Sequence, residues 1–136
     1  MTGAGAKAKG ANGERELAAL LTEWATEVGK GLGLKRNLEQ TRGGGHDLTG
    51  LEAYSLAVEV KRQESLALGA WWRQAVEQGE KAKATPVLAW RQNRKPWRFR
   101  IRIWCWPCHS RQLDIDLDAT EFKEWFQAVI KERKDP

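Results

Sequence analysis

The chain has 136 residues, of which 41% are hydrophobic and 30% charged, as expected for one folded domain. No apolar run approaches the roughly 18 residues that cross a membrane. The net charge of +5 and the pI of about 9.4 favour a polyanionic partner such as nucleic acid. Two cysteines and two histidines exclude a disulfide framework and a four-thiolate zinc site within one chain.

The N-terminal segment is rich in Gly, Ala and Lys, and we expect a flexible basic tail over residues 1–10 ahead of one domain over residues 11–136. It lacks the apolar stretch of a signal peptide, so the expected location is the cytoplasm. Asn12 can cap the first helix. The apolar face of that helix recurs at helical spacing and comprises Leu17, Leu21, Trp24 and Val28. Glu16 lies on another face, where we expect solvent.

The rest of the chain alternates strand and helix patterns. The predicted elements are strands over residues 34–41, 47–51 and 54–61, a helix over 69–83, strands over 86–91 and 97–104 around a turn at 93–96, an edge strand over 113–117, and a last helix capped by Asp118 or Thr120. This order predicts an α/β fold, with a mixed β-sheet flanked by helices and a C-terminal helix after the α-β-β-β-α-β-β core.

Acidic residues mark a candidate site. Glu59 and Lys61 lie two apart in a strand and therefore project from one face. A turn centred near residue 53 would bring Asp47 opposite Glu59. Glu14 heads the apolar face of the first helix. Carboxylates in this arrangement suit Mg²⁺ or Mn²⁺, and an adjacent ammonium can neutralise developing charge. The alternative is a solvated strand face, because such E-x-K triplets are common in charged proteins.

A basic block runs over residues 91–102 and carries six basic side chains and no acid. Three of these side chains share one face of the predicted strand, namely Arg98, Arg100 and Arg102. Their mutual repulsion can be relieved by DNA phosphates or by Asp114 and Asp116 on the next strand. Trp97, on the opposite face, either packs in the sheet or stacks on an exposed base.

A further motif runs from Cys105 to His109 and fits haem-attachment and redox-dithiol patterns. No export signal precedes it, Met1 is the only methionine, and polar residues follow it where a redox dithiol would begin a helix. We therefore expect a surface turn with incidental cysteines.

Five segments resemble, in order, motifs of the PD-(D/E)XK nuclease superfamily, and within it the archaeal-type Holliday junction resolvases and their phage relatives. They are GANGERELAALL (10–21), GGGHDLTG (43–50), LAVEVKR (56–62), WWRQAVEQ (71–78) and TPVLAWR (85–91). The resemblance implies a restriction-endonuclease-like fold and a Mg²⁺-dependent DNA endonuclease, for which Mn²⁺ also serves. The substrate implied is branched DNA such as a Holliday junction. The alternatives are a general nicking or restriction-like nuclease and a non-catalytic DNA-binding module.

The resemblance also implies roles for individual residues. The metal set is Glu14, Asp47, Glu59 and Val60, and the catalytic set is Glu14, Asp47, Glu59, Lys61 and Gln74, with Gln78 as the alternative to Gln74. The predicted DNA contacts are Lys9, Lys35, Arg36, Arg42, Arg62, Arg94 and Lys95. Two symmetric nicks need two active sites, so we expect a homodimer.

Overall fold

The computed structural model describes the chain at residues 3–36, 47–104 and 112–132, with side chains from residue 12 onward. The elements are α1 (Gly3–Glu27), β1 (Lys35–Arg36), β2 (Leu48–Thr49), the 3₁₀ turn η1 (Glu52–Tyr54), β3 (Leu56–Arg62), α3 (Leu68–Ala82), β4 (Thr85–Arg91), β5 (Arg98–Trp104), β6 (Gln112–Asp118) and α4 (Ala119–Glu132). The predicted order of helices and strands is confirmed. Among the described helices, none combines the length and apolarity that a membrane crossing requires.

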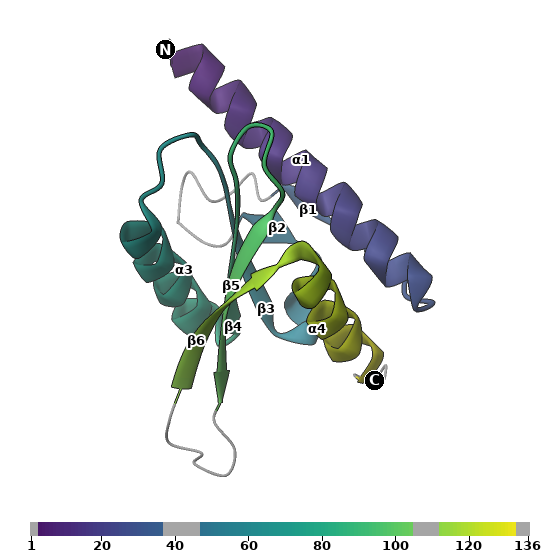
Figure 1. The fold of residues 1–136 in the computed structure, drawn as a ribbon. Coiled ribbons are helices and arrows are strands. Elements are labelled where there is room, and N and C mark those ends of the chain that lie inside the picture. Colours follow the sequence, from purple (N-terminus) through teal and green to yellow (C-terminus); the bar gives the residue numbers. More distant parts are fainter. Residues whose placement is uncertain (1–2, 37–46, 105–111, 133–136) are drawn as a thin grey trace.

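The main sheet has the strand order β3-β4-β5-β6 (Figure 1). Strands β3 and β4 are parallel, whereas the other two pairs are antiparallel. A parallel pair needs a crossover connection, and α3 provides it between β3 and β4. Strands β1 and β2 form a separate two-stranded sheet. The predicted mixed sheet flanked by helices is therefore confirmed.

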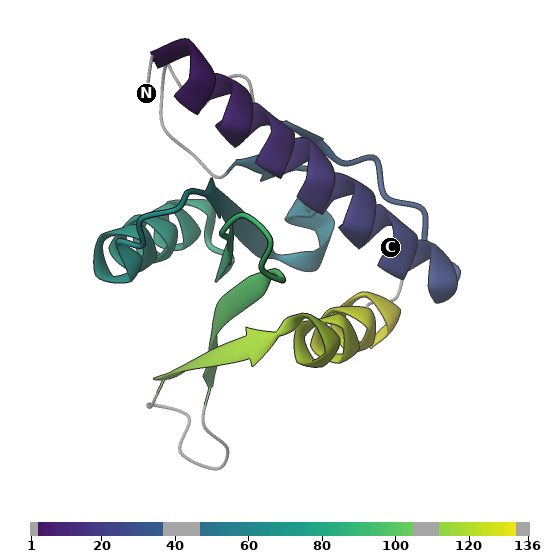
Figure 2. The ribbon, with the colours of Figure 1, turned by 45° about the horizontal axis from the view of Figure 1, so that its top comes forward.

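Side-chain alternation divides the sheet into two faces, with α1 and α4 on one side and α3 on the other (Figure 2). The first face belongs to the larger core, whose strand residues include Leu56, Val58, Val60, Val87, Phe99 and Ile101. The second face packs Leu88 and Trp90 against the helix residues Trp71, Trp72 and Ala75. Glu59 is the register partner of Leu88, so it lies on the α3 face of the edge strand β3.

The larger core is centred on Phe99, which is fully buried and stacks on Phe122 with ring centroids 3.9 Å apart. We expect Phe99→Ala to lower the free energy of unfolding by about 3–5 kcal/mol, because the cavity cannot close between two layers. Urea denaturation measures this change. Leu113→Ala, at a side chain 47% exposed, is the control and should change stability by less than about 1 kcal/mol. A similar loss in both variants would contradict the assigned core.

The start of the first helix differs from the prediction. Helix α1 begins at Gly3, not after Asn12. The Ala and Lys residues that precede Asn12 are strong helix formers, and they extend the helix through positions where glycine alone is unfavourable. The boundary between tail and domain at residue 10 stays a prediction, since one helix runs across it.

The connection before β3 also differs from the predicted hairpin. Strand β2 pairs with β1, through Arg36 and Leu48, and not with β3 in a ladder. Between β2 and β3 the chain forms η1, which ends at Ser55 with a left-handed φ of 56°. The hairpin prediction was wrong because the three-residue η1 turn redirects the chain, whereas a two-residue hairpin loop would return it along its own path. The predicted strand over 34–41 is confirmed only at Lys35–Arg36, and residues 37–46 lie outside the described part.

Helix α4 begins with a reciprocal capping box. The Asp118 carboxylate accepts a hydrogen bond from the Glu121 amide at 2.8 Å, and the Glu121 carboxylate accepts one from the Asp118 amide at 2.9 Å. Asp118 and Thr120 were the two predicted caps, and the residue that caps α4 is Asp118.

Candidate active site

Asp47 and Glu59 are brought together by two hydrogen bonds from Asp47 to the β3 main chain on either side of Glu59, one through the Asp47 amide and one through its carboxylate. The Asp47 amide donates to the Val58 carbonyl at 2.9 Å, and the Val60 amide donates to Asp47 Oδ2 at 2.6 Å. Both acidic residues are buried, with exposed fractions of 4% and 1%. The closeness expected from a hairpin is thus achieved by a side-chain contact to the β3 backbone.

Glu59 is the most electrostatically perturbed group of the site. The pKa of Glu59 is raised to about 8, first by burial and then by the negative charge of Asp47, while the Lys61 ammonium opposes the shift. Within the described part of the chain, neither Glu59 carboxylate oxygen has a hydrogen-bond partner. A buried carboxylate without partners is strongly unfavourable, and a cation bound there would remove that penalty.

Lys61 and Gln74 lie on the same face of the sheet as Glu59. Lys61 follows Glu59 by two residues on β3, is partly buried and is the register partner of Trp90. Gln74 lies on α3, the helix that covers this face, and is partly buried. Gln78, one turn further along α3, has the same degree of burial. Strand β3 therefore carries an ammonium close enough to Glu59 to act on its pKa, and helix α3, which packs on this face, carries two amides.

Glu14 contributes a third carboxylate from α1. Burial raises the pKa of Glu14, the Arg36 hydrogen bond opposes this shift, and the charge of Asp47 adds to it. Arg36 Nε donates to Glu14 Oε2 at 2.5 Å. Over the described ranges, no three His, Cys, Asp or Glu side chains are grouped closely enough to hold a metal ion. The structure therefore places Asp47 and Glu59 together, while Glu14 is engaged with Arg36.

Comparisons with known proteins identify a sequence family and several similar chains among solved structures. The family described as "Phage putative PDDEXK endonuclease" matches residues 5–111. The chain belongs to this phage endonuclease family. A comparison with curated proteins gives no match. The solved structure of Hjc from Archaeoglobus fulgidus, a Holliday junction resolvase from an archaeal hyperthermophile, is similar with a TM-score of 0.55 and 20% identity, covering 85% of this chain and 96% of that one. The restriction-endonuclease-like fold is thereby confirmed.

The basic residues predicted to contact the DNA of this endonuclease differ in their surroundings. Lys35, Arg94 and Lys95 are exposed. Arg36 is paired with Glu14, and the Arg62 side chain is only 16% exposed. The side chains of Lys9 and Arg42 lie outside the described part. Among the predicted contacts with described side chains, Lys35, Arg94 and Lys95 are therefore the exposed ones, and their contact with DNA stays a prediction.

The polar contacts of Glu16 were missed by sequence reasoning, which placed this side chain in solvent. Glu16 Oε1 accepts hydrogen bonds from Arg91 Nη1 and, at 3.0 Å, from Trp97 Nε1. Arg62 Nε lies 4.0 Å from Glu16 Oε2. Trp97 is 5% exposed, so it packs in the core. The signal available in the sequence was the basic block itself, which has no acid of its own and needs one from another segment.

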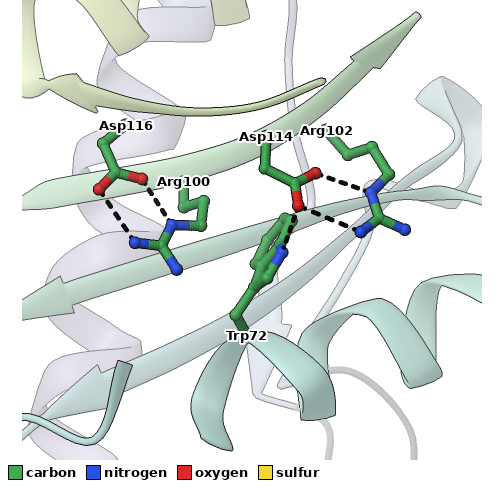
Figure 3. Close-up of polar contacts among 5 residues, drawn as sticks. All are labelled: Trp72, Arg100, Arg102, Asp114 and Asp116. Carbon is green, nitrogen blue, oxygen red and sulfur yellow. Dashed lines mark hydrogen bonds and ion pairs between the residues drawn. The ribbon is translucent and has the colours of Figure 1, made fainter. Parts of the chain in front are cut away.

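Two of the three arginines on one face of β5, Arg100 and Arg102, are paired with acids of β6 (Figure 3). Arg100 pairs with Asp116 through contacts of 2.5 and 3.1 Å, and Arg102 pairs with Asp114 through contacts of 2.8 and 3.2 Å. Trp72 Nε1 donates to Asp114 Oδ2 at 2.9 Å, and both guanidinium groups lie within 6 Å of the Trp72 ring. The Arg102 hydrogen bond lowers the pKa of Asp114. For Arg100 and Arg102, the charge is therefore compensated by the neighbouring acids, which was one of the two explanations. The Cys105–His109 motif lies outside the described residues.

Proposed function

We propose that this endonuclease is Mg²⁺-dependent and cleaves branched DNA of the Holliday junction class. The observation that carries the metal dependence is the buried pair of Asp47 and Glu59, in which both Glu59 oxygens lack a partner among the described residues. Two adjacent carboxylates suit Mg²⁺, and Mn²⁺ accepts the same ligands. Bound there, the ion would polarise the phosphoryl oxygen and lower the pKa of a bound water.

Asp47 and Glu59 would hold the ion, with Val60 fixing Asp47 through its amide. Glu14 would join them after leaving Arg36. Lys61 would neutralise charge that develops on the phosphate, because its ammonium lies beside the acidic pair. Gln74 would support the site from α3. These assignments follow the resemblance to the PD-(D/E)XK superfamily, and the geometry of the described residues is compatible with them.

The preference for a branched substrate is supported by the fold shared with Hjc, a Holliday junction resolvase. Resolution of a four-way junction needs two nicks at symmetric positions, so we propose that the active form is a homodimer. The basic composition and the exposed Lys35, Arg94 and Lys95 support binding to phosphates.

The test is a cleavage assay on labelled four-way junction, linear duplex and single-stranded DNA, each with Mg²⁺ and with a chelator. We expect Mg²⁺-dependent cleavage of the junction in preference to the duplex. Lys61→Ala should reduce the rate by about 100-fold or more, since it removes a group that acts on the transition state. The charge-matched control is Lys83→Ala, at the exposed C-terminal end of α3, which should cleave normally.

Each outcome of this assay has a definite consequence. Cleavage of linear duplex alone would overturn the junction preference and leave a general nicking nuclease. Cleavage that survives in Lys61→Ala would overturn the assignment of the site. DNA binding with no Mg²⁺-stimulated cutting by the wild-type protein would identify a non-catalytic DNA-binding module.

A further inference from the structure

The turn between β4 and β5 is closed by its own hydrogen bonds. Arg91 Nε donates to the Lys95 carbonyl at 2.7 Å, and the Lys95 amide donates to the Gln92 carbonyl at 3.2 Å. Arg94, at the tip, adopts a φ of 61°, a left-handed conformation that non-glycine residues rarely adopt. A residue keeps such a conformation only where its surroundings determine it, so this turn is held in one shape.

A second loop fixes the turn from the side. Glu64, in the connection between β3 and α3, accepts a hydrogen bond from Gln92 Nε2 through its main-chain carbonyl at 2.7 Å. The Glu64 carboxylate accepts another from the Asn93 amide at 2.7 Å. The residues joined by these two hydrogen bonds lie 28 and 29 positions apart in the sequence. Surface loops usually leave such groups to water, so this double contact joins the loops into one unit.

Helix α1 also holds the turn, through Glu16. Glu16 holds Arg91 on the β4 side of the turn and Trp97 on the β5 side. Three segments, α1, the β3–α3 connection and the β4–β5 turn, therefore meet through two glutamates. Both acids are used inside this assembly, whereas Arg94 and Lys95 are exposed.

The turn lies at the catalytic end of the sheet. Arg91 is the register partner of Arg62, and Trp90 is the partner of Lys61. The turn thus begins within two residues of the strand position that carries the candidate lysine. Figure 1 shows the turn and the β3–α3 loop at this same end of the sheet, with the turn beside α1.

We propose that residues 92–95 are a preformed DNA-contacting arm, in which Glu64 and Glu16 are positioning residues and Arg94 and Lys95 contact phosphates flanking the cleaved bond. This inference rests on the proposed nuclease function and adds the arm and its two anchors to it. An arm ordered before binding loses little conformational entropy on DNA, which gives tighter binding than a mobile basic loop would.

The decisive variant is Glu64→Ala, measured by fluorescence anisotropy with labelled junction DNA and a chelator, so that no cleavage occurs. Removal of a negative charge near DNA should tighten binding if charge alone matters. If Glu64 positions the arm, the substitution should instead weaken binding, and we expect an affinity about 10-fold lower. Glu64→Gln keeps a carbonyl oxygen for the Asn93 amide and should bind nearly as the wild type does. Glu124 is an exposed acid on α4, and Glu124→Ala is the charge-matched control, which should bind DNA without loss of affinity.

Two further measurements separate positioning from loss of fold. The double variant Arg94→Ala, Lys95→Ala should lower the slope of log affinity against log salt by about 1.8, the value for two lost phosphate contacts. The matched pair Lys81→Ala, Lys83→Ala, at the other end of the sheet, should leave that slope unchanged. In hydrogen exchange, Glu64→Ala should speed exchange of the turn amides while the β3 and β4 amides stay protected.

The failures are distinguishable. Wild-type protein that binds DNA in the chelator but never cuts it overturns the proposed function and leaves the arm intact. Unchanged or tighter binding by Glu64→Ala, or an unchanged salt slope in the Arg94 and Lys95 double variant, overturns the arm alone. Absence of DNA binding by the wild-type protein overturns both.

Discussion

Glu59→Gln is expected to lower the cleavage rate by on the order of 1,000-fold and, above about pH 8, to raise the stability of the metal-free protein. The two effects have one cause. Glu59 is 1% exposed, lies beside Asp47 and has no hydrogen-bond partner for either oxygen among the described residues. Its charge is therefore unfavourable in the metal-free fold and needed for the cation. Glutamine has the same shape and lacks that charge.

Cleavage of junction DNA in Mg²⁺ and urea denaturation in a chelator measure the two effects on one preparation. Glu23→Gln, at an exposed position of α1, is the matched control and should change neither quantity. A Glu59→Gln protein that still cleaves at a wild-type rate would remove Glu59 from the site. One that loses stability above pH 8 would show that the charged carboxylate has partners which stabilise it.

The metal-free wild-type protein should lose stability as the pH rises from about 4.5 to about 8. The pKa of Glu59 is about 8 in the folded chain, against an ordinary value of 4.5, so between these values the folded state holds a proton that the unfolded state has released. The free energy of unfolding then falls by up to about 1.4 kcal/mol per pH unit. The fall in stability ends once the pH passes the folded pKa. Burial also raises the pKa of Glu14, and this shift acts in the same direction.

Mg²⁺ should oppose this dependence, because the ion binds the deprotonated carboxylates. At 100 times its dissociation constant a ligand stabilises the fold by about 2.7 kcal/mol, and here the gain should grow with pH. Thermal denaturation across this pH range, with Mg²⁺ and with a chelator, checks it. Glu59→Gln is the control and should make the chelator profile shallower, leaving the contribution of Glu14. A wild-type profile that is flat without metal would contradict the burial of an ionisable carboxylate here.

Much of the fold was predictable because its signals are local. The alternation along β3 placed Glu59 and Lys61 on one face, and the helical spacing of Leu17, Leu21 and Trp24 placed the buried face of α1. Such periodicities depend only on neighbouring residues and on the geometry of one element. The order of elements and the mixed sheet followed from them.

The position of Asp47 was predicted correctly for a wrong reason. A symmetric hairpin would have paired it across from Glu59, whereas β2 pairs with β1 and Asp47 instead accepts the Val60 amide. The start of α1 was misjudged because a capping residue such as Asn12 is a weak signal when good helix formers precede it.

By itself, the sequence determined the elements, their order and the strand face that carries the E-x-K residues, since these depend on local periodicity. Only the tertiary structure decided the partners of the charged groups: Glu14 with Arg36, Glu16 with Arg91, and Glu64 with the Asn93 amide. Each pair joins segments at least 22 positions apart. A charged side chain can reach many partners of opposite charge, and only the packed fold selects one.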